Sequence, residues 1–268
     1  MRIFAFDLDG TLLSKNGVIL DSSKQVMNHL KEQQDAIVIA SGRTFEEIVD
    51  IVKELRLDQY PHAYLIGYNG VELKHFASQE SLYRSTITWD EVKLIWADVK
   101  KYGLSLHVFE EKKLYLSPGM TWFLQVAEEA KARNQFVDFS VFETPQPIYK
   151  ALVIDDPERL DKYQPNIDKR ILQCVSAFKS APMIIEFVSL EGTKGRSVQE
   201  LARLLQVDKE NIYAFGDEEN DISMIEIAGH GIAMGNAKEK VKQKARYIAK
   251  SHQEDGIYEM LKELDVIH

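Results

Sequence analysis

The sequence predicts an α/β protein in which a doubly wound, Rossmann-like parallel sheet is interrupted by an inserted α+β domain. Short apolar runs alternate with amphipathic stretches near the N-terminus, and the same alternation returns towards the C-terminus. The stretch between them has more aromatic residues and more strand-like alternation. These observations indicate a discontinuous core, residues 1–83 and 188–268, with an insertion at residues 84–187.

The composition is that of an ordinary globular protein. The 268 residues are 45% hydrophobic and 28% charged, so the chain can bury a sizeable core. Apolar runs stay shorter than the roughly 18 residues of a membrane helix, and Asp7 comes too early for a secretion signal. The single cysteine, Cys174, excludes an internal disulfide and a cysteine zinc site. We therefore expect a cytoplasmic protein.

The net charge of −9 comes from 33 basic and 42 acidic residues. A diffuse acidic balance argues against nucleic acid as the main partner and is typical of a surface that keeps a protein soluble. It does not exclude a phosphate ligand, because a local site can be positive inside a negative protein, especially if the site holds a metal. We expect a small-molecule partner, no nucleic acid and no membrane.

The two flanking parts predict alternating strands and helices. Short apolar runs predict buried strands, and apolar residues at helical spacing after Asp21 and Thr44 predict the first two helices. The expected strands are residues 2–6, 36–40, 63–66, 212–215, 231–234 and 247–249, and the expected helices begin near residues 21, 44, 194, 222, 238 and 257. Strands joined by helical crossovers imply a parallel sheet.

The inserted segment predicts a different, α+β arrangement. Its expected strands are residues 104–109, 113–116, 149–154, 171–178 and 183–188, and its expected helices are residues 89–101, 120–133 and 157–168. This change of pattern places the expected domain boundaries near residues 84 and 188.

Two carboxylates follow the first predicted strand, in Asp7-Leu8-Asp9-Gly10-Thr11. Ligands of doubly wound sheets bind at the carboxyl ends of strands. Carboxylates at i and i+2 there suit a hard cation such as Mg²⁺, and they also suit a nucleophile beside a general acid/base. A surface turn or a helix cap is the simpler alternative, since Asp-Gly is a common turn dipeptide.

Two further motifs suit a phosphate ligand. Ser41-Gly42-Arg43 follows the second predicted strand, and a hydroxyl with a glycine amide at a helix N-terminus binds phosphate oxygens, although a plain helix cap explains it too. Lys194-Gly195 opens a later helix, and its ammonium suits neutralisation of a phosphate or a carboxylate. One lysine among 33 basic residues carries little weight alone.

An acidic cluster, residues 216–221, follows the predicted strand at residues 212–215. The helix dipole explains Glu218 and Glu219 as acidic residues at a helix N-terminus. It does not explain why Asp217 follows a buried strand, as Asp7 does. This parallel favours a second set of site residues at the same edge of the sheet.

The order and spacing of these four motifs resemble the haloacid dehalogenase (HAD) superfamily of phosphohydrolases. The resemblance is closest to the Cof-type subfamily, in which a large α/β cap is inserted between the second and third motifs. It covers the whole chain, including Met234-Gly235-Asn236-Ala237 and Glu254-Asp255-Gly256. It implies a HAD-like core, with residues 84–187 as the cap.

The resemblance also implies a reaction and a cofactor. It implies a Mg²⁺-dependent phosphatase for small phosphorylated metabolites, with Asp7 as the nucleophile and Asp9 as the general acid/base. Mg²⁺ would be held by Asp7, the backbone carbonyl of Asp9, and Asp217. Sugar phosphates, sugar alcohol phosphates and phosphorylated cofactors all fit the family.

The resemblance assigns further residues to the phosphate group and to support. The residues that would hold phosphate oxygens are the Leu8 amide, Ser41, the Gly42 amide, Lys194 and Asn220. Asp221 would support a metal-bound water or Lys194, and Thr11 would shape the loop. Arg43 would either touch the substrate or pair with an acid. Asn69-Gly70 follows the third predicted strand, in a loop that borders the mouth of the active site in the family, although a hairpin turn is the favoured explanation. Asn236 lies in a segment that resembles a family loop near the active site, and a structural role is expected for it.

Two alternatives stay open from the sequence. Phosphomutases of the phosphomannomutase type share the nucleophile motif and a similar cap, and a non-catalytic regulator that binds a phosphorylated metabolite could use the same fold. The insertion has no obvious arginine cluster for a second phosphate, which favours hydrolysis. A monomer and a homodimer are both compatible with the sequence.

Overall fold

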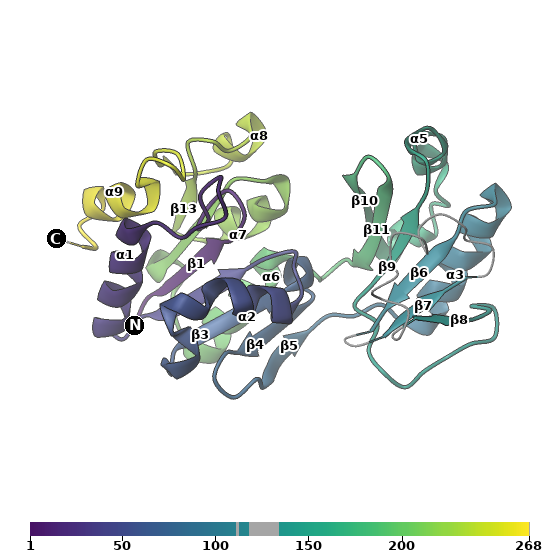
Figure 1. The fold of residues 1–268 in the computed structure, drawn as a ribbon, viewed down its shortest axis with the longest axis horizontal. Coiled ribbons are helices and arrows are strands. Elements are labelled where there is room, and N and C mark those ends of the chain that lie inside the picture. Colours follow the sequence, from purple (N-terminus) through teal and green to yellow (C-terminus); the bar gives the residue numbers. More distant parts are fainter. Residues whose placement is uncertain (111–112, 118–133, 268) are drawn as a thin grey trace. The chain divides into compact units, whose positions relative to one another are not determined.

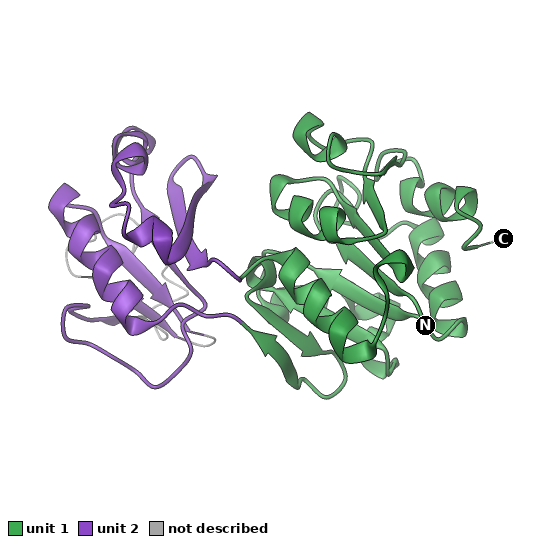
Figure 2. Cartoon of the chain, turned by 180° about the vertical axis from the view of Figure 1, so that it is seen from behind, with its two compact units in different colours: residues 1–84, 192–268 green, residues 85–191 purple. Residues whose placement is uncertain are grey.

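The structure is a computed structural model that describes residues 1–110, 113–117 and 134–267 (Figure 1). The chain divides into two compact units (Figure 2). Unit 1 consists of residues 1–84 and 192–268, and unit 2 consists of residues 85–191. The expected boundary at residues 187 and 188 falls inside a strand that runs to Ser189, so this strand belongs wholly to unit 2.

Unit 1 is built on a mostly parallel sheet with the strand order β14-β13-β12-β1-β2-β3-β4-β5 among the described residues. Its strands are β1 (Ile3–Asp7), β2 (Ala36–Ala40), β3 (Ala63–Gly67), β4 (Glu72–His75), β5 (Ser81–Arg84), β12 (Ile212–Gly216), β13 (His230–Ala233) and β14 (Tyr247–Ile248). The expected parallel sheet is confirmed by the pairing of β14 through β3. The antiparallel hairpin β4–β5 is an addition that the sequence did not indicate.

The helices of unit 1 are α1 (Asp21–Glu32), α2 (Phe45–Val52), α6 (Lys194–Leu205), α7 (Ile222–Ile227), α8 (Glu239–Lys242) and α9 (Gly256–Glu263). Thr44 begins α2 as expected, with its hydroxyl and Glu47 forming a capping box. Helices α6 and α7 pack with Ile3 and Ala5 in one apolar core. Helices α1 and α9 lie side by side near the C-terminus (Figure 1). The α/β fold class is confirmed.

Unit 2 has a mixed sheet of its own, with the strand order β10-β11-β9-β6-β7-β8 among the described residues. Only β7 and β8 pair in parallel among these strands. Its strands are β6 (Leu106–Phe109), β7 (Leu114–Leu116), β8 (Asn134–Phe136), β9 (Lys150–Ile154), β10 (Val175–Ala181) and β11 (Ile184–Ser189), and its helices are α3 (Trp89–Val99) and α5 (Pro157–Tyr163). Helix α3 buries Val92, Ile95 and Val99 against this sheet. The expected helix at residues 120–133 lies outside the described residues.

One expected strand of unit 2 begins later than the sequence suggested. Residues 171–178 were expected to be extended, but Ile171–Gln173 form a 3₁₀ turn and β10 begins at Val175. The turn is closed by hydrogen bonds from Ile171 N–H to the Asp168 carbonyl and from Cys174 N–H to the Ile171 carbonyl. The side chain of Ile171 extends from this turn into the core of unit 2, which explains why an apolar residue stands there.

Candidate active site

Three neighbouring strands of unit 1 end in polar residues at the same edge of the sheet. Asp7 is the last residue of β1, Ser41 follows β2, and Asp217 follows β12. Because β12, β1 and β2 are parallel and in register, their carboxyl ends lie together. Lys194 comes to the same place as the first residue of α6, after the N-cap Thr193. Four residues from distant parts of the sequence therefore meet in unit 1.

Lys194 is the electrostatic centre of this edge. Its side chain is fully buried, and its Nζ donates hydrogen bonds to Asp7 Oδ1 at 2.5 Å and to Asp221 Oδ1 at 2.7 Å. Burial alone would lower the pKa of Lys194, but the two carboxylates outweigh burial and raise it. Lys194 is therefore held as an ammonium between two carboxylates.

Asp221 and Asp217 are fixed by their own hydrogen bonds. Asp221 Oδ2 accepts the backbone N–H of Asp217 at 2.9 Å and that of Glu218 at 3.0 Å. Asp217 Oδ1 accepts the hydroxyl of Thr11 at 2.9 Å, which ties the loop after β1 to the loop after β12. These bonds fix the carboxylates before any ligand arrives.

Burial makes two of the carboxylates reluctant to ionise. Desolvation raises the pKa of Asp217 to about 6, against the opposing hydrogen bond from Thr11. Desolvation also raises the pKa of Asp7 well above its usual value, although Lys194 opposes this effect. The positive charge near Asp7 and Asp217 is therefore too small to offset the cost of burying their ionised forms.

This deficit fits a divalent cation. One carboxylate oxygen each of Asp7, Asp217 and Asp221 lies within 4.8 Å of the others, and all three residues are buried. Three carboxylates face the one ammonium of Lys194 among the described residues, and oxygen ligands suit Mg²⁺. Since Asp221 already binds Lys194 and two backbone amides, Asp7 and Asp217 are the carboxylates best suited to hold the ion.

Asp9 has a different partner. Its two oxygens accept hydrogen bonds from Arg43 Nε and Nη2, both at 2.8 Å, in a two-point ion pair. The hydrogen bonds that Arg43 donates to Asp9 raise the pKa of Arg43. Both side chains are partly exposed to solvent. Arg43 was expected either to touch the substrate or to pair with an acid, and in the structure it pairs with Asp9.

The expected phosphate residues border the same edge. Ser41 is buried, and its hydroxyl oxygen accepts the backbone N–H of Arg43 at 3.2 Å. Leu8 follows Asp7 with a buried side chain, which leaves its amide as its only group suited to an anion. Asn220 is exposed, and its Nδ2 donates to Asn69 Oδ1 at 2.8 Å.

Two asparagines contact these residues. Asn69 forms the expected turn between β3 and β4, and it also contacts Asn220. Asn236 Nδ2 donates to the Gly10 carbonyl at 2.8 Å and lies 3.4 Å from Asp217 Oδ2. Each follows a buried strand of the sheet, as the other residues at this edge do.

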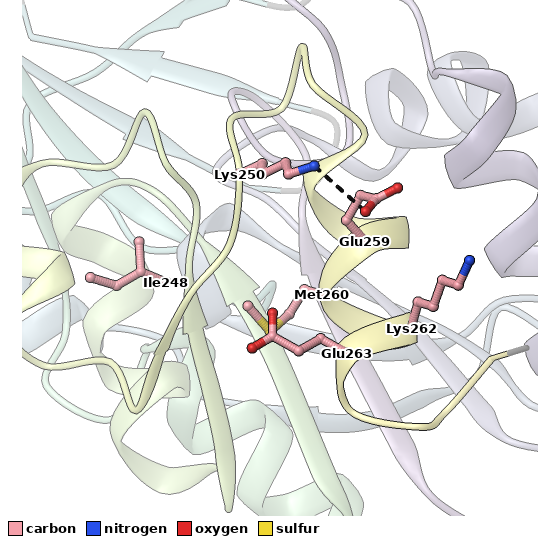
Figure 3. A pocket seen from close by; sticks show the side chains of 6 residues that line it. All are labelled: Ile248, Lys250, Glu259, Met260, Lys262 and Glu263. Atoms are coloured by element: carbon pink, nitrogen blue, oxygen red, sulfur yellow. Dashed lines mark ion pairs between the residues drawn. The ribbon is translucent and has the colours of Figure 1, made fainter.

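A separate hollow of unit 1 contains none of the expected site residues. It has a volume of about 310 Å³ and is lined by Ile248, Lys250, Glu259, Met260, Lys262 and Glu263 (Figure 3). Lys250 and Glu259 form an ion pair of 3.5 Å across it. It lies at β14, the outer strand of the sheet, whereas the carboxylate cluster lies at β1 and β12. No helix among the described residues is long and apolar enough to cross a membrane.

Comparisons with known proteins agree with this arrangement. The sequence profile of the haloacid dehalogenase-like hydrolases matches residues 4–261. The 5-amino-6-(5-phospho-D-ribitylamino)uracil phosphatase YwtE of Bacillus subtilis is 27% identical over 285 residues, with 96% of each chain covered.

Solved structures give the same family. TM0651 from Thermotoga maritima has a TM-score of 0.81 at 28% identity, covering 98% of this chain and 97% of that one. The sugar phosphatase BT4131 has a TM-score of 0.76 at 26% identity, with both chains fully covered. The chain belongs to the haloacid dehalogenase-like hydrolase family.

Proposed function

We propose that the protein hydrolyses phosphate monoesters of small metabolites through an aspartyl-phosphate formed on Asp7. The observation that carries the proposal is the buried Asp7 carboxylate at the end of β1, bound to Lys194 and beside Asp217. The family and its relatives named as phosphatases support a phosphoric monoester hydrolase.

In the first half of the reaction, an Asp7 oxygen attacks phosphorus. A new bond forms between this oxygen and phosphorus while the bond from phosphorus to the leaving alcohol breaks. The departing oxygen takes a proton from the Asp9 carboxyl group, so that it leaves as a neutral alcohol. Because both Asp9 oxygens bind Arg43, this role requires the ion pair to release one oxygen when the substrate is present.

In the second half, Asp9 acts in the opposite direction. Its carboxylate takes a proton from a water molecule, whose oxygen attacks the phosphorus of the aspartyl-phosphate. The bond between phosphorus and Asp7 breaks, inorganic phosphate leaves, and the Asp7 carboxylate is restored. One carboxyl group can serve both steps because the leaving group and the water occupy the same side of the phosphoryl group.

The remaining site residues hold the phosphoryl group. The Ser41 hydroxyl, the Leu8 and Gly42 amides, the Lys194 ammonium and the Asn220 amide can donate hydrogen bonds to its oxygens. Asp221 keeps Lys194 in place, and Thr11 keeps Asp217 in place. Donors fixed before the reaction stabilise the charge that develops on these oxygens.

The carboxylate cluster also suggests a metal. Asp7 and Asp217, with the backbone carbonyl of Asp9, would hold Mg²⁺. The ion would supply neutralisation of the negative charge shared by the Asp7 carboxylate and the phosphoryl oxygens. The raised pKa values of Asp7 and Asp217 support this assignment, since a nearby cation would favour their ionised forms.

Unit 2 is proposed to select the leaving group. Its place between the second and third motifs matches that of a Cof-type cap, and its separate core allows it to vary without changing unit 1. The named relatives include a sugar phosphatase and a phosphatase for a phosphorylated ribityl compound. We therefore propose sugar phosphates, sugar alcohol phosphates or phosphorylated cofactors as the substrate class. A cytoplasmic location and a monomeric or homodimeric state remain predictions from the sequence.

The test is phosphate release from a panel of phosphorylated metabolites, with and without Mg²⁺, by the wild type and Asp7→Asn. We expect metal-dependent release that falls by several orders of magnitude in the variant, while the variant keeps its fold. The ranking of kcat/KM then identifies the substrate class. A wild type that moves phosphate within a hexose phosphate without releasing it would indicate a mutase. Binding without turnover would indicate a regulator.

A further inference from the structure

The turn after β3 has an unusual backbone. Tyr68, Asn69 and Gly70 are consecutive and have φ values of 54°, 63° and 106°. Residues with a side chain rarely adopt this left-handed region, because Cβ crowds the following carbonyl. A run that includes tyrosine is therefore held by its surroundings, and such strain is concentrated at functional sites.

The surroundings that hold this turn are the motifs of the candidate site. The N–H of Tyr68 donates to the Arg43 carbonyl at 3.1 Å, and the N–H of Asn69 donates to the Ser41 carbonyl at 3.0 Å. Gly70 packs directly on the backbone in front of α6, since a Cβ on it would lie 2.0 Å from the Thr193 carbonyl carbon. The turn thus joins the segment after β2 to the segment that carries Lys194.

The Asn69 side chain reaches the third segment of the site. Its amide lies over Gly42, where a Cβ would be only 2.8 Å from Asn69 Oδ1. The same oxygen accepts a hydrogen bond from Asn220 Nδ2 at 2.8 Å. Asn220 is exposed, so this bond determines which way its amide turns.

The bond has a consequence for phosphate binding. An asparagine Nδ2 carries two protons, and Asn69 accepts one of them. Because Asn69 Oδ1 can only accept, the group of Asn220 that it binds is the amide nitrogen and not the amide oxygen. The second proton of Nδ2 can then be donated to an anion.

We propose that Asn69 is a positioning residue of the phosphate site, acting through Asn220. The inference rests on the proposed function, because it takes Asn220 as a donor to the substrate phosphoryl group. Asn69 orients the Asn220 side chain so that its Nδ2 can donate to the phosphoryl group. The strained turn at residues 68–70 brings Asn69 within hydrogen-bond distance of Asn220.

A double-mutant cycle tests the coupling between the two residues. The variants are Asn69→Gly, Asn220→Ala and the double variant, and glycine is chosen because it tolerates the left-handed backbone of Asn69. The measurements are kcat and KM for the best ester of the panel, and the affinity for inorganic phosphate by calorimetry with Mg²⁺ present. We expect Asn69→Gly to weaken phosphate binding and lower kcat/KM about tenfold, as for the loss of one oriented hydrogen bond to an anion.

The cycle separates positioning from a general effect on the fold. If Asn69 acts through Asn220, Asn69→Gly causes no further loss in the Asn220→Ala background. Losses that multiply in the double variant, or an Asn69→Gly variant with wild-type kinetics and phosphate affinity, would overturn the proposal. If Asn69→Gly is too unstable to measure, Asn69→Ser replaces it, since serine is also too short to reach Asn220.

A control variant and the wild type complete the experiment. Gln79 is exposed, also has a left-handed backbone with φ of 57°, and lies in the loop between β4 and β5. Gln79→Gly should leave kinetics and phosphate affinity unchanged. A wild type that binds phosphate but releases none from any ester would contradict the proposed function, while the phosphate affinities would still decide the role of Asn69. A wild type that does not bind phosphate would overturn both.

Discussion

At the scale of single residues, the buried charges of unit 1 depend on one another. Lys194 has no exposed surface and binds Asp7 and Asp221, which are also buried. A buried ion without a partner costs several kcal/mol, so each of these charges is tolerated only because the others are present. The arrangement that prepares the proposed nucleophile therefore also affects stability.

We expect Lys194→Met to lower the free energy of unfolding by about 3–5 kcal/mol, because two buried carboxylates lose their counter-charge. Urea denaturation without divalent cations measures this change. The double variant Lys194→Met/Asp7→Asn should recover part of the loss, since one of the uncompensated carboxylates becomes neutral. Equal stability of the single and double variants would show that Lys194 acts by packing alone.

The histidine His107 is a buried titratable residue of unit 2. His107 on β6 has no exposed surface, and burial lowers its pKa to about 4. The unfolded chain takes up a proton near pH 6.5, whereas the folded chain does so only near pH 4. Since the unfolded state binds more protons between these values, His107 reduces stability as the pH falls through this range.

We expect the contribution of His107 to fall by about 3 kcal/mol between pH 6.5 and pH 4. The measurement is the free energy of unfolding at several pH values for the wild type and His107→Gln. The variant removes only this titration, so the difference between the two curves should depend on pH in that window and be constant above pH 7.5. A difference that is constant from pH 4 to pH 8 would contradict the burial of a neutral His107.

At the scale of elements, the close approach of the turn after β3 to the start of α6 organises unit 1. Gly70 lies against Thr193, and the Ser197 hydroxyl donates to the Gly70 carbonyl at 2.9 Å. Only glycine fits there, because any Cβ would meet backbone atoms that cannot move without shifting α6. Lys194 lies within this same contact, so the position of its helix depends on Gly70.

Gly70→Ala should destabilise the protein by about 1–3 kcal/mol more than Gly17→Ala, through overpacking. Gly17 is a matched control because it also has a left-handed backbone, with φ of 71°, but a Cβ there meets nothing within 4 Å. Both changes place alanine at a positive φ, and only Gly70→Ala adds a clash with backbone atoms. Chemical denaturation of the two variants measures the difference, and equal losses would mean that α6 shifts at little cost.

At the scale of the whole molecule, two units with separate cores divide the chain. One apolar cluster of unit 1 includes Ile3 and Val198, whereas that of unit 2 includes Val92 and Phe187. The carboxylate cluster lies entirely in unit 1. A ligand of this cluster should therefore stabilise unit 1 directly.

We expect Mg²⁺ to raise the temperature at which unit 1 unfolds, because the proposed metal site is formed by carboxylates that come together only in the folded chain. At a concentration of about a hundred times its Kd, the stabilisation is about 2.7 kcal/mol. Scanning calorimetry with Mg²⁺ and with a chelator measures the shift. Asp217→Asn, which removes one ligand, should abolish it. A shift of the same size in the variant would show that Mg²⁺ binds elsewhere.

The local pattern of the sequence predicted most of the core fold. The buried strands β1, β2, β3 and β12 are apolar except for Asp7 at the end of β1, and the N-cap of α2 lies at Thr44 as expected. These features depend on neighbours in the chain. The 3₁₀ turn at Ile171–Gln173 was missed because its apolar residues are explained equally well by a strand, and only the surrounding core distinguishes the two.

The sequence by itself determined the alternation of strands and helices, the polar residues at strand ends and the family resemblance. Each of these depends only on residues that are close together in the chain or on the order of the motifs. Only the tertiary structure decided the partners of those polar residues. Arg43 meets Asp9 across 34 positions of the chain, and Asn220 meets Asn69 across 151. Such pairs depend on strand order and on the angle at which loops leave the sheet, and no local pattern encodes either.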